Sequence, residues 1–144
     1  HSHACAMKRT REICPVVQVG IRSLSFEESE LIKEKNLKIF WAKNIVDNDA
    51  WFDEAISMLS KNVYITFDLD GLDPSIMPSV GTPEPGGIGY YQALRLLKKV
   101  CSKRNVVGFD VVELCPNEKE ISSDFTAAKL VYKLIGYKFS NFGK

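Results

Sequence analysis

Two aspartates that directly follow an apolar run are the first residues whose types and spacing indicate chemistry. Asp68 and Asp70 come after residues 62–67, a run that is typical of a β-strand. Carboxylates placed so close together at a strand end repel each other unless a cation or a proton lies between them. Carboxylate oxygens suit Mg(II), Mn(II) and Ca(II). The pattern therefore predicts a divalent metal site, with the alternative that the two side chains order the turn after the strand.

A third carboxylate and a histidine add to this chemistry. Glu113 follows the apolar run 106–112, and a carboxylate at a strand end can accept two parallel hydrogen bonds from a planar cation. The alternative is a surface glutamate that pairs with a nearby lysine. His3 can titrate near neutral pH and carry a proton to a leaving amine, whereas a histidine so close to a terminus is usually just exposed.

Short β-branched runs alternate with helical patterns along the chain. Strands are predicted at residues 16–21, 37–41, 62–67 and 106–112. Helices are predicted from a capping box at Ser25 and Glu28 to about Lys35, after a cap at Asn48 or Asp49, along the face of Tyr90, Leu94, Leu97 and Cys101, and from Ser122 or Ser123 to about Phe139. This order predicts an α/β fold, a three-layer α/β/α sandwich with a mainly parallel sheet. We expect the apolar strands to be covered on both faces and ligands to bind beyond their carboxyl ends.

The stretch of residues 66–87 reads TFDLDGLDPSIMPSVGTPEPGG. It resembles a signature of the ureohydrolase (arginase/agmatinase) family over its whole length, from the Thr-Phe-Asp-Leu-Asp start through the Asp-Pro and the second Pro-Ser to the closing Gly-Gly. The form Gly-Thr-Pro-Glu-Pro-Gly-Gly looks like the agmatinase branch, because true arginases tend to carry apolar residues in place of Glu84 and Pro85.

Three shorter segments are similar to the same family. Residues 111–116 (VVELCP) look like the segment whose glutamate grips the substrate guanidinium. Residues 18–23 (QVGIRS) look like the family's Q-x-G-I-R strand, in which we interpret Arg22 as a structural guanidinium that fixes a loop. Ser2-His3-Ala4, ahead of a predicted helix, resembles the segment that supplies a histidine near the metals.

The resemblance implies a role for each of these side chains. Asp68 would bridge two Mn(II) ions and Asp70 would ligate one of them, while Glu113 and Thr82 would contact the substrate and His3 would carry the proton. The implied reaction is hydrolysis of a small guanidino compound, agmatine above all, to urea and putrescine in polyamine biosynthesis. The resemblance also implies a homo-oligomer, a trimer or hexamer, when the enzyme is complete.

The sequence departs from the family pattern in one respect. The family's other metal ligands lie upstream, in an Asp-Ala-His-x-Asp segment and on an earlier loop histidine, and neither occurs here. We therefore expect residues 1–144 to be the C-terminal part of a single arginase-like domain, incomplete at its N-terminal side and inactive alone. One alternative is a non-catalytic truncated ureohydrolase. The other is a haloacid-dehalogenase-like phosphatase, because residues 67–71 resemble the nucleophile motif of that family.

The composition of the chain excludes several classes of protein. A chain of 144 residues, 45% hydrophobic with a net charge of +1, fits one folded domain and argues against a nucleic-acid surface. The sequence has no apolar run of roughly 20 residues to span a membrane. It has four widely spaced cysteines without a C-x-x-C pair, and it opens without a secretory leader, so we expect a cytoplasmic protein.

Overall fold

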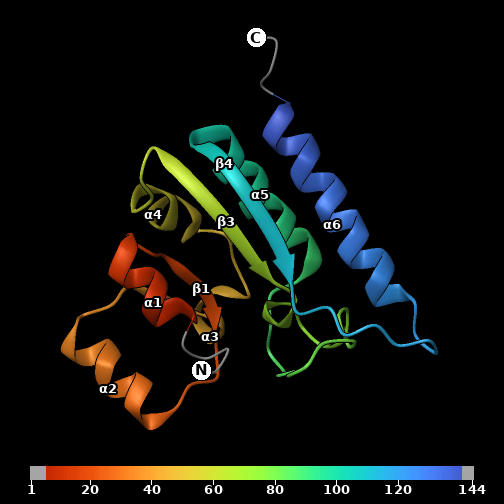
Figure 1. Ribbon diagram of the computed structural model, residues 1–144, viewed down its shortest axis with the longest axis horizontal. Helices are drawn as coiled ribbons and strands as arrows, with labels where there is room; N and C mark the ends of the chain where they lie inside the picture. Colours follow the sequence, from red (N-terminus) through yellow and green to blue (C-terminus); the bar gives the residue numbers. More distant parts are fainter. Residues whose placement is uncertain (1–5, 141–144) are drawn as a thin grey trace.

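Parallel strands and helices alternate along residues 6–140, the part of the chain that this computed structural model describes (Figure 1). The strands are Gln18–Ile21 (β1), Ile39–Trp41 (β2), Asn62–Asp68 (β3) and Asn105–Val112 (β4). The helices are Ala6–Ile13 (α1), Phe26–Glu34 (α2), Ala42–Ile45 (α3), Phe52–Ser57 (α4), Tyr90–Lys103 (α5) and Ser122–Phe139 (α6), with a 3₁₀ turn at Leu69–Gly71 (η2). The predicted strands and helices are confirmed, and within residues 6–140 the short α3 and the turn η2 were not expected.

The capping box predicted for α2 is present. The backbone N–H of Glu28 donates to Ser25 Oγ at 3.2 Å, and the N–H of Ser25 donates to Glu28 Oε2 at 2.7 Å. These two bonds satisfy donors that a helix start leaves without an intrahelical partner.

The prediction that Ser122 or Ser123 caps the start of α6 is wrong. Ile121, which precedes the helix, provides no side-chain cap, and Ser122 and Ser123 lie inside it. The carboxylate of Glu120 accepts instead from the backbone N–H of Ser122 at 2.7 Å and from the hydroxyl of Ser123 at 2.6 Å. A negative group suits this position because the helix start carries unpaired N–H dipoles.

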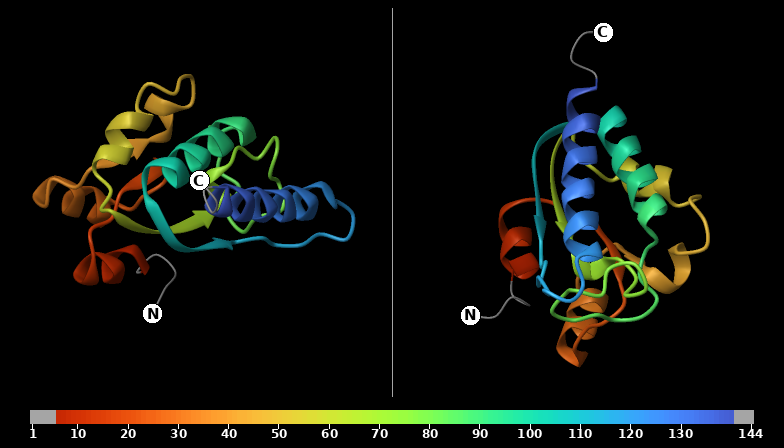
Figure 2. Two further views of the ribbon diagram at one scale, coloured as in Figure 1. Left: turned by 90° about the horizontal axis from the view of Figure 1, so that it is seen from above. Right: turned by 90° about the vertical axis from the view of Figure 1, so that its right-hand side faces the viewer.

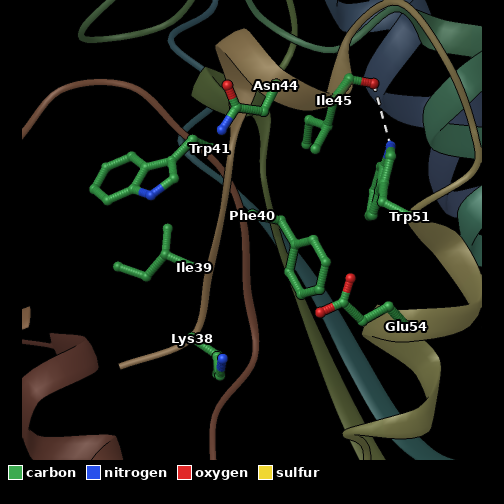
Figure 3. A pocket seen from close by; sticks show the side chains of 8 residues that line it. All are labelled: Lys38, Ile39, Phe40, Trp41, Asn44, Ile45, Trp51 and Glu54. Carbon is green, nitrogen blue, oxygen red and sulfur yellow. Dashed lines mark hydrogen bonds between the residues drawn. The ribbon is translucent and has the colours of Figure 1, made fainter. Parts of the chain in front are cut away.

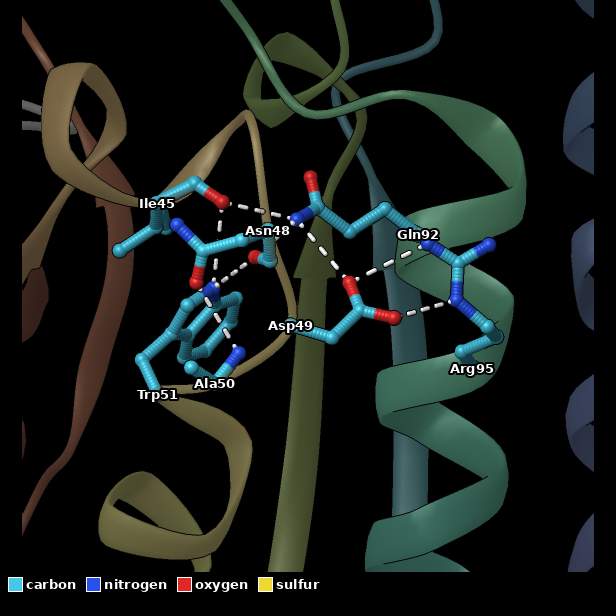
Figure 4. A network of polar contacts seen from close by, with 7 residues as sticks. All are labelled: Ile45, Asn48, Asp49, Ala50, Trp51, Gln92 and Arg95. Carbon is cyan, nitrogen blue, oxygen red and sulfur yellow. Dashed lines mark hydrogen bonds and ion pairs between the residues drawn. The ribbon is translucent and has the colours of Figure 1, made fainter.

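The cap predicted for α4 at Asn48 or Asp49 is also corrected, because the helix begins at Phe52 after Trp51 and has no side-chain cap. Asp49 turns toward α5, where Arg95 donates to both of its carboxylate oxygens (Figure 4). Gln92 Nε2 donates to the carbonyl oxygens of Ile45 and Asn48 at 2.8 and 2.9 Å, and to Asp49 Oδ1. The segment between α3 and α4 is thus fastened to α5.

The strands form two parallel pairs instead of the single predicted sheet. β1 pairs with β2 and β3 pairs with β4, and within residues 6–140 no ladder joins the two pairs. The two pairs nevertheless share one apolar core, because Val17 and Val19 pack against the buried cluster that includes Leu69 and Leu94.

Helices lie on both sides of the strands, which confirms the three layers. α4, α5 and α6 lie on one side and α1 on the other (Figure 2). α1 has no buried residue, so it covers little of the sheet. Tyr64 of β3 and Val107 of β4 are 58% and 57% exposed, and the prediction that both faces of these strands are buried is therefore wrong for the described residues.

The loop after β3 contributes the centre of the core. Leu69, Leu72 and Met77 are fully buried together with Leu130 and Leu134 of α6. The polar residues that alternate with them along this loop are consequently held on a rigid support. Within residues 6–140, every helix is too short or too polar to cross a membrane.

Candidate metal and substrate site

The acidic residues predicted from the sequence meet at one edge of the β3–β4 pair. Asp68, the last residue of β3, lies opposite Val112, the last residue of β4. Glu113 therefore leaves the sheet beside Asp68, and Asp70 follows within η2. Ligands of parallel sheets bind beyond this edge.

Asp68 and Asp70 are oriented by different partners. Asp68 Oδ1 accepts from the backbone N–H of Asp70 at 2.8 Å. Asp70 Oδ2 accepts from the hydroxyl of Thr82, while its Oδ1 is buried and has no hydrogen-bond partner among the described residues. A buried carboxylate oxygen without a donor is costly and needs a proton or a cation. The geometry at Asp70 therefore fits a metal ion.

The local electrostatics agree with this fit. Burial raises the pKa of the Asp68 carboxyl, and the nearby charges of Asp70 and Glu113 raise it further, against the lowering effects of the Asp70 N–H and of Arg22. Mutual repulsion among carboxylates favours a bound divalent cation. Among residues 6–140, however, no three His, Cys, Asp or Glu side chains are grouped closely enough to hold a metal by themselves. Asp68 and Asp70 could therefore hold a metal ion only as part of a larger ligand set.

Glu113 occupies an unusual backbone position. Its φ is +69°, in the left-handed region that residues other than glycine rarely adopt. The following segment is fixed against the loop, since Leu114 forms a bridge with Val80 and the N–H of Cys115 donates to the Ser79 carbonyl at 2.9 Å. Such strain concentrates at binding and catalytic sites, and here it sets the direction in which the exposed Glu113 carboxylate leaves the sheet.

Asp73 orders the loop after β3, as predicted. Its carboxylate accepts from the backbone N–H groups of Ser75, Gly86 and Gly87 at 3.0, 2.9 and 3.1 Å, and its own N–H donates to the Ile88 carbonyl at 3.2 Å. Hydrogen bonding by the side chain of Ser75, together with these backbone N–H groups, lowers the pKa of Asp73 to about 2. One carboxylate thus joins the two limbs of the loop.

Arg22 fixes the same loop from β1, which confirms its interpretation as a loop-fixing residue. Its guanidinium donates to the carbonyl oxygen of Asp70 at 2.7 Å and to those of Glu84 and Pro85 at 3.0 and 3.2 Å. Glu84 takes part here through its backbone, and its side chain is exposed.

The structure brings together four of the five residues predicted for the site. Asp68, Asp70 and Glu113 interact electrostatically, and Thr82 contacts Asp70 directly. The contact between Thr82 and Asp70 was not predicted, since the resemblance places the threonine near the substrate. His3 lies outside the described residues.

A separate open pocket of about 310 Å³ lies along β2 (Figure 3). Aromatic rings of Phe40, Trp41 and Trp51 line it, together with the side chains of Lys38 and Glu54. None of these residues belongs to the acidic site, and the pocket holds one charge of each sign beside an apolar wall.

Comparisons with known proteins place the chain in a family. The family model described as the arginase family matches residues 1–136. The chain belongs to the arginase family. The N(1)-aminopropylagmatine ureohydrolase of a Synechocystis strain is 45% identical over 95% of this chain and 45% of its own length. The agmatinase of Pyrococcus horikoshii is 33% identical over 94% of this chain and 47% of its own.

Solved structures agree with this membership. The agmatine ureohydrolase of Thermoplasma volcanium matches 99% of this chain and 50% of its own, with a TM-score of 0.83 and 31% identity. The predicted arginase-like fold and the resemblance to agmatinase-type ureohydrolases are thus confirmed. This arginase-family chain spans about half the length of the relatives it matches.

Proposed function

We propose that residues 1–144 belong to a Mn(II)-dependent ureohydrolase, which splits a guanidino compound into urea and an amine. The observation that carries this proposal is the buried Oδ1 of Asp70, beside Asp68 at the end of β3, which has no hydrogen-bond partner in the part of the chain that the structure describes. Glu113 stands at the end of the neighbouring strand, where it can reach a substrate beside that metal. Membership of the arginase family supports the same reaction class.

Each side chain has a distinct task in this proposal. Asp68 and Asp70 would hold Mn(II), two ions in the complete enzyme, and the bound metal would supply a water molecule that ionises near neutral pH. Glu113 accepts two N–H groups of the guanidinium and orients its carbon. The reaction would replace the bond between that carbon and the alkylamine nitrogen by a bond to the water oxygen, and His3 would carry the proton that the leaving nitrogen takes up.

Agmatine is the substrate that we propose, because Glu84 and Pro85 give the loop its agmatinase-like form; its products would be putrescine and urea, in cytoplasmic polyamine biosynthesis. A second candidate is N(1)-aminopropylagmatine, since the 45% identical relative is named for it. Both compounds carry the same guanidinium, so Glu113 would bind both alike.

We further propose that the chain is the C-terminal part of one ureohydrolase domain, which assembles into homo-oligomers when complete. Its length, about half that of its relatives, supports this. So do the exposed outer sides of β3 and β4 and the exposed apolar side chains of α6. Within residues 6–140, no third metal ligand joins Asp68 and Asp70. The competing proposal is therefore a truncated ureohydrolase without catalytic activity.

Urea release tests the proposal. The full-length gene product would be incubated with Mn(II) and agmatine, N(1)-aminopropylagmatine, arginine or 4-guanidinobutyrate. We expect urea from agmatine or its aminopropyl derivative, with arginine a poor substrate. Preference for arginine would contradict the substrate proposal, and no urea from any compound would contradict the reaction. Phosphate release from p-nitrophenyl phosphate would instead favour the phosphatase alternative.

A further inference from the structure

Arg22 directs two of its guanidinium nitrogens to backbone carbonyls of the loop after β3, and its Nη1 donates to the Gly20 carbonyl of β1 at 3.5 Å. Nη2 donates to the carbonyls of Asp70 at 2.7 Å and Leu72 at 3.4 Å, and Nε donates to those of Glu84 and Pro85. These carbonyls belong to the two limbs of the loop, one that begins at η2 and one that closes it. A rigid guanidinium fork can join both limbs at once, which a lysine ammonium on a flexible stem cannot do in the same geometry.

Thr82 holds the same aspartate at its side chain. Its hydroxyl donates to Asp70 Oδ2, and within residues 6–140 the buried Oδ1 has no hydrogen-bond partner. The backbone of Asp70 is thus fixed from β1, and its carboxylate is fixed from the tip of the loop. Together these contacts decide which oxygen of Asp70 is free and where it lies.

We propose that Arg22 and Thr82 are positioning residues, which hold the free oxygen of Asp70 in place for a divalent cation and thereby set the cation affinity of the site. This inference rests on the proposed metal role of Asp70. It gives Thr82 a task on the ligand instead of on the substrate, and it makes Arg22 more than a structural tie. Residues that orient metal ligands typically change metal affinity by about 10- to 100-fold when substituted.

The chain offers a matched control for Arg22. Arg104, at the end of α5, also donates only to carbonyls: Nε to Leu59 at 3.2 Å and Nη2 to Ile56 at 2.6 Å. It fastens α4 and contacts no residue of the acidic site. Arg104→Lys therefore removes a comparable set of backbone contacts without touching Asp70.

The test is a Mn(II) titration of the ¹⁵N-labelled full-length protein, followed by paramagnetic broadening of the amide signals of Asp68, Asp70 and Gly71. We expect Arg22→Lys and Thr82→Val each to weaken binding by about tenfold. Thr82→Ser keeps the hydroxyl and should restore the affinity. Arg104→Lys should leave it unchanged, even if it lowers the melting temperature.

The outcomes separate this inference from the proposed function. If Asp70→Asn abolishes Mn(II) binding but Thr82→Val, or a folded Arg22→Lys, leaves the Mn(II) affinity unchanged, the positioning role is overturned and the metal assignment stands. Should Arg22→Lys fail to fold, Thr82→Val decides alone. Equal losses in Arg22→Lys and Arg104→Lys would show a general effect on folding and would also overturn the inference. Binding that survives Asp70→Asn, or no local broadening in the unsubstituted chain, would overturn the metal assignment itself.

Discussion

Four aspartates lie within β3, β4 and the loop between β3 and α5, and each has its own set of donors. Asp68 and Asp70 keep oxygens available at the strand end. Asp73 gives its oxygens to backbone N–H groups of the loop. Asp110 accepts from Thr66 Oγ1 at 2.6 Å and from a tyrosine hydroxyl on the open face of the sheet. The hydrogen-bond donors around each aspartate therefore distinguish the four side chains, although the residue type is the same.

At this scale we predict opposite results for two conservative substitutions in the full-length protein. Asp68→Asn should weaken Mn(II) binding by more than about a hundredfold, beyond the usual range for residues that only support ligands. Asp73→Asn should change Mn(II) affinity by less than about tenfold and should lower the melting temperature instead, since three N–H groups lose a charged acceptor. Calorimetric titration and thermal melts measure both. Equal losses of metal affinity would show that Asp73 is a ligand.

Residue types predicted the candidate site better than they predicted its contacts. The Asp68 and Asp70 pair and the acidic Glu113 follow from their places after apolar strands. The contact of Thr82 with Asp70 spans twelve positions inside an irregular loop, where no periodicity predicts which side chains meet. The reach of Arg22 to Glu84 likewise depends on how β1 lies beside that loop, which is a tertiary property.

Among the elements, local signals predicted the helices and strands, and long-range contacts changed their details. The capping box of α2 lies within four consecutive residues, and its prediction is confirmed. The cap of α6 was assigned to the wrong residue because Glu120 also binds the hydroxyl of Ser79 at 2.8 Å, 41 positions away. The burial of β3 was overestimated because an apolar run does not reveal whether a helix covers it.

The loop between η2 and α5 should be sensitive at one glycine and tolerant at another. A Cβ on Gly87 would lie 2.4 Å from the carbonyl carbon of Leu72, whereas a Cβ on Gly81 would meet no atom within 4 Å. We expect Gly87→Ala to cost at least about 2 kcal/mol, because backbone atoms must move. Gly81→Ala should stay within about 0.5 kcal/mol or stabilise slightly. Urea unfolding of both variants decides this, and similar costs would contradict the close approach at Gly87.

The start of α6 should make stability depend on acid pH. Hydrogen bonds from Ser122, Ser123 and Ser79 lower the pKa of Glu120 from 4.5 to about 2. A lowered folded-state pKa means that the carboxylate stabilises the fold above about pH 4.5 and that this contribution is lost as the pH falls toward 2.

Glu120→Gln tests this dependence. The variant should melt a few degrees lower at pH 6. The difference from the unsubstituted chain should shrink as the pH approaches 2. Glu118→Gln, at a neighbouring exposed position, serves as the control for a general effect of charge. A difference that stayed constant from pH 6 to pH 2 would argue against the ionised cap.

At the scale of the whole molecule, a large apolar surface is left open. The outward side of α6 and the residue before it expose large apolar side chains by 47% to 74%, namely Ile121, Phe125, Tyr132, Ile135 and Phe139. Among the described residues, the outer edges of the two strand pairs are unpaired, and exposed edges beside apolar surface favour association between chains.

We therefore expect the 144-residue chain to bind Mn(II) only weakly, to release no urea from agmatine, and to associate with itself in solution. Calorimetry, a urea assay and gel filtration measure the three properties. Micromolar or tighter Mn(II) binding by a monomer would mean that the chain holds a complete metal site. Replacement of Phe125 and Tyr132 by lysine should reduce association without unfolding the chain, because both side chains are exposed.

Because the backbone at Glu113 is left-handed, selection for stability and selection for ligand binding favour different residues at this position. Glycine, or to a lesser degree asparagine, adopts such a conformation at lower cost than glutamate does. A library of variants sorted only for thermal resistance would therefore enrich glycine at this position. Given the guanidinium-binding role that we propose for Glu113, the same library sorted for capture of a guanidinium ligand would enrich glutamate. On that role, a redesign for thermal stability must keep glutamate at position 113, because a residue that suits the backbone better would not bind the ligand.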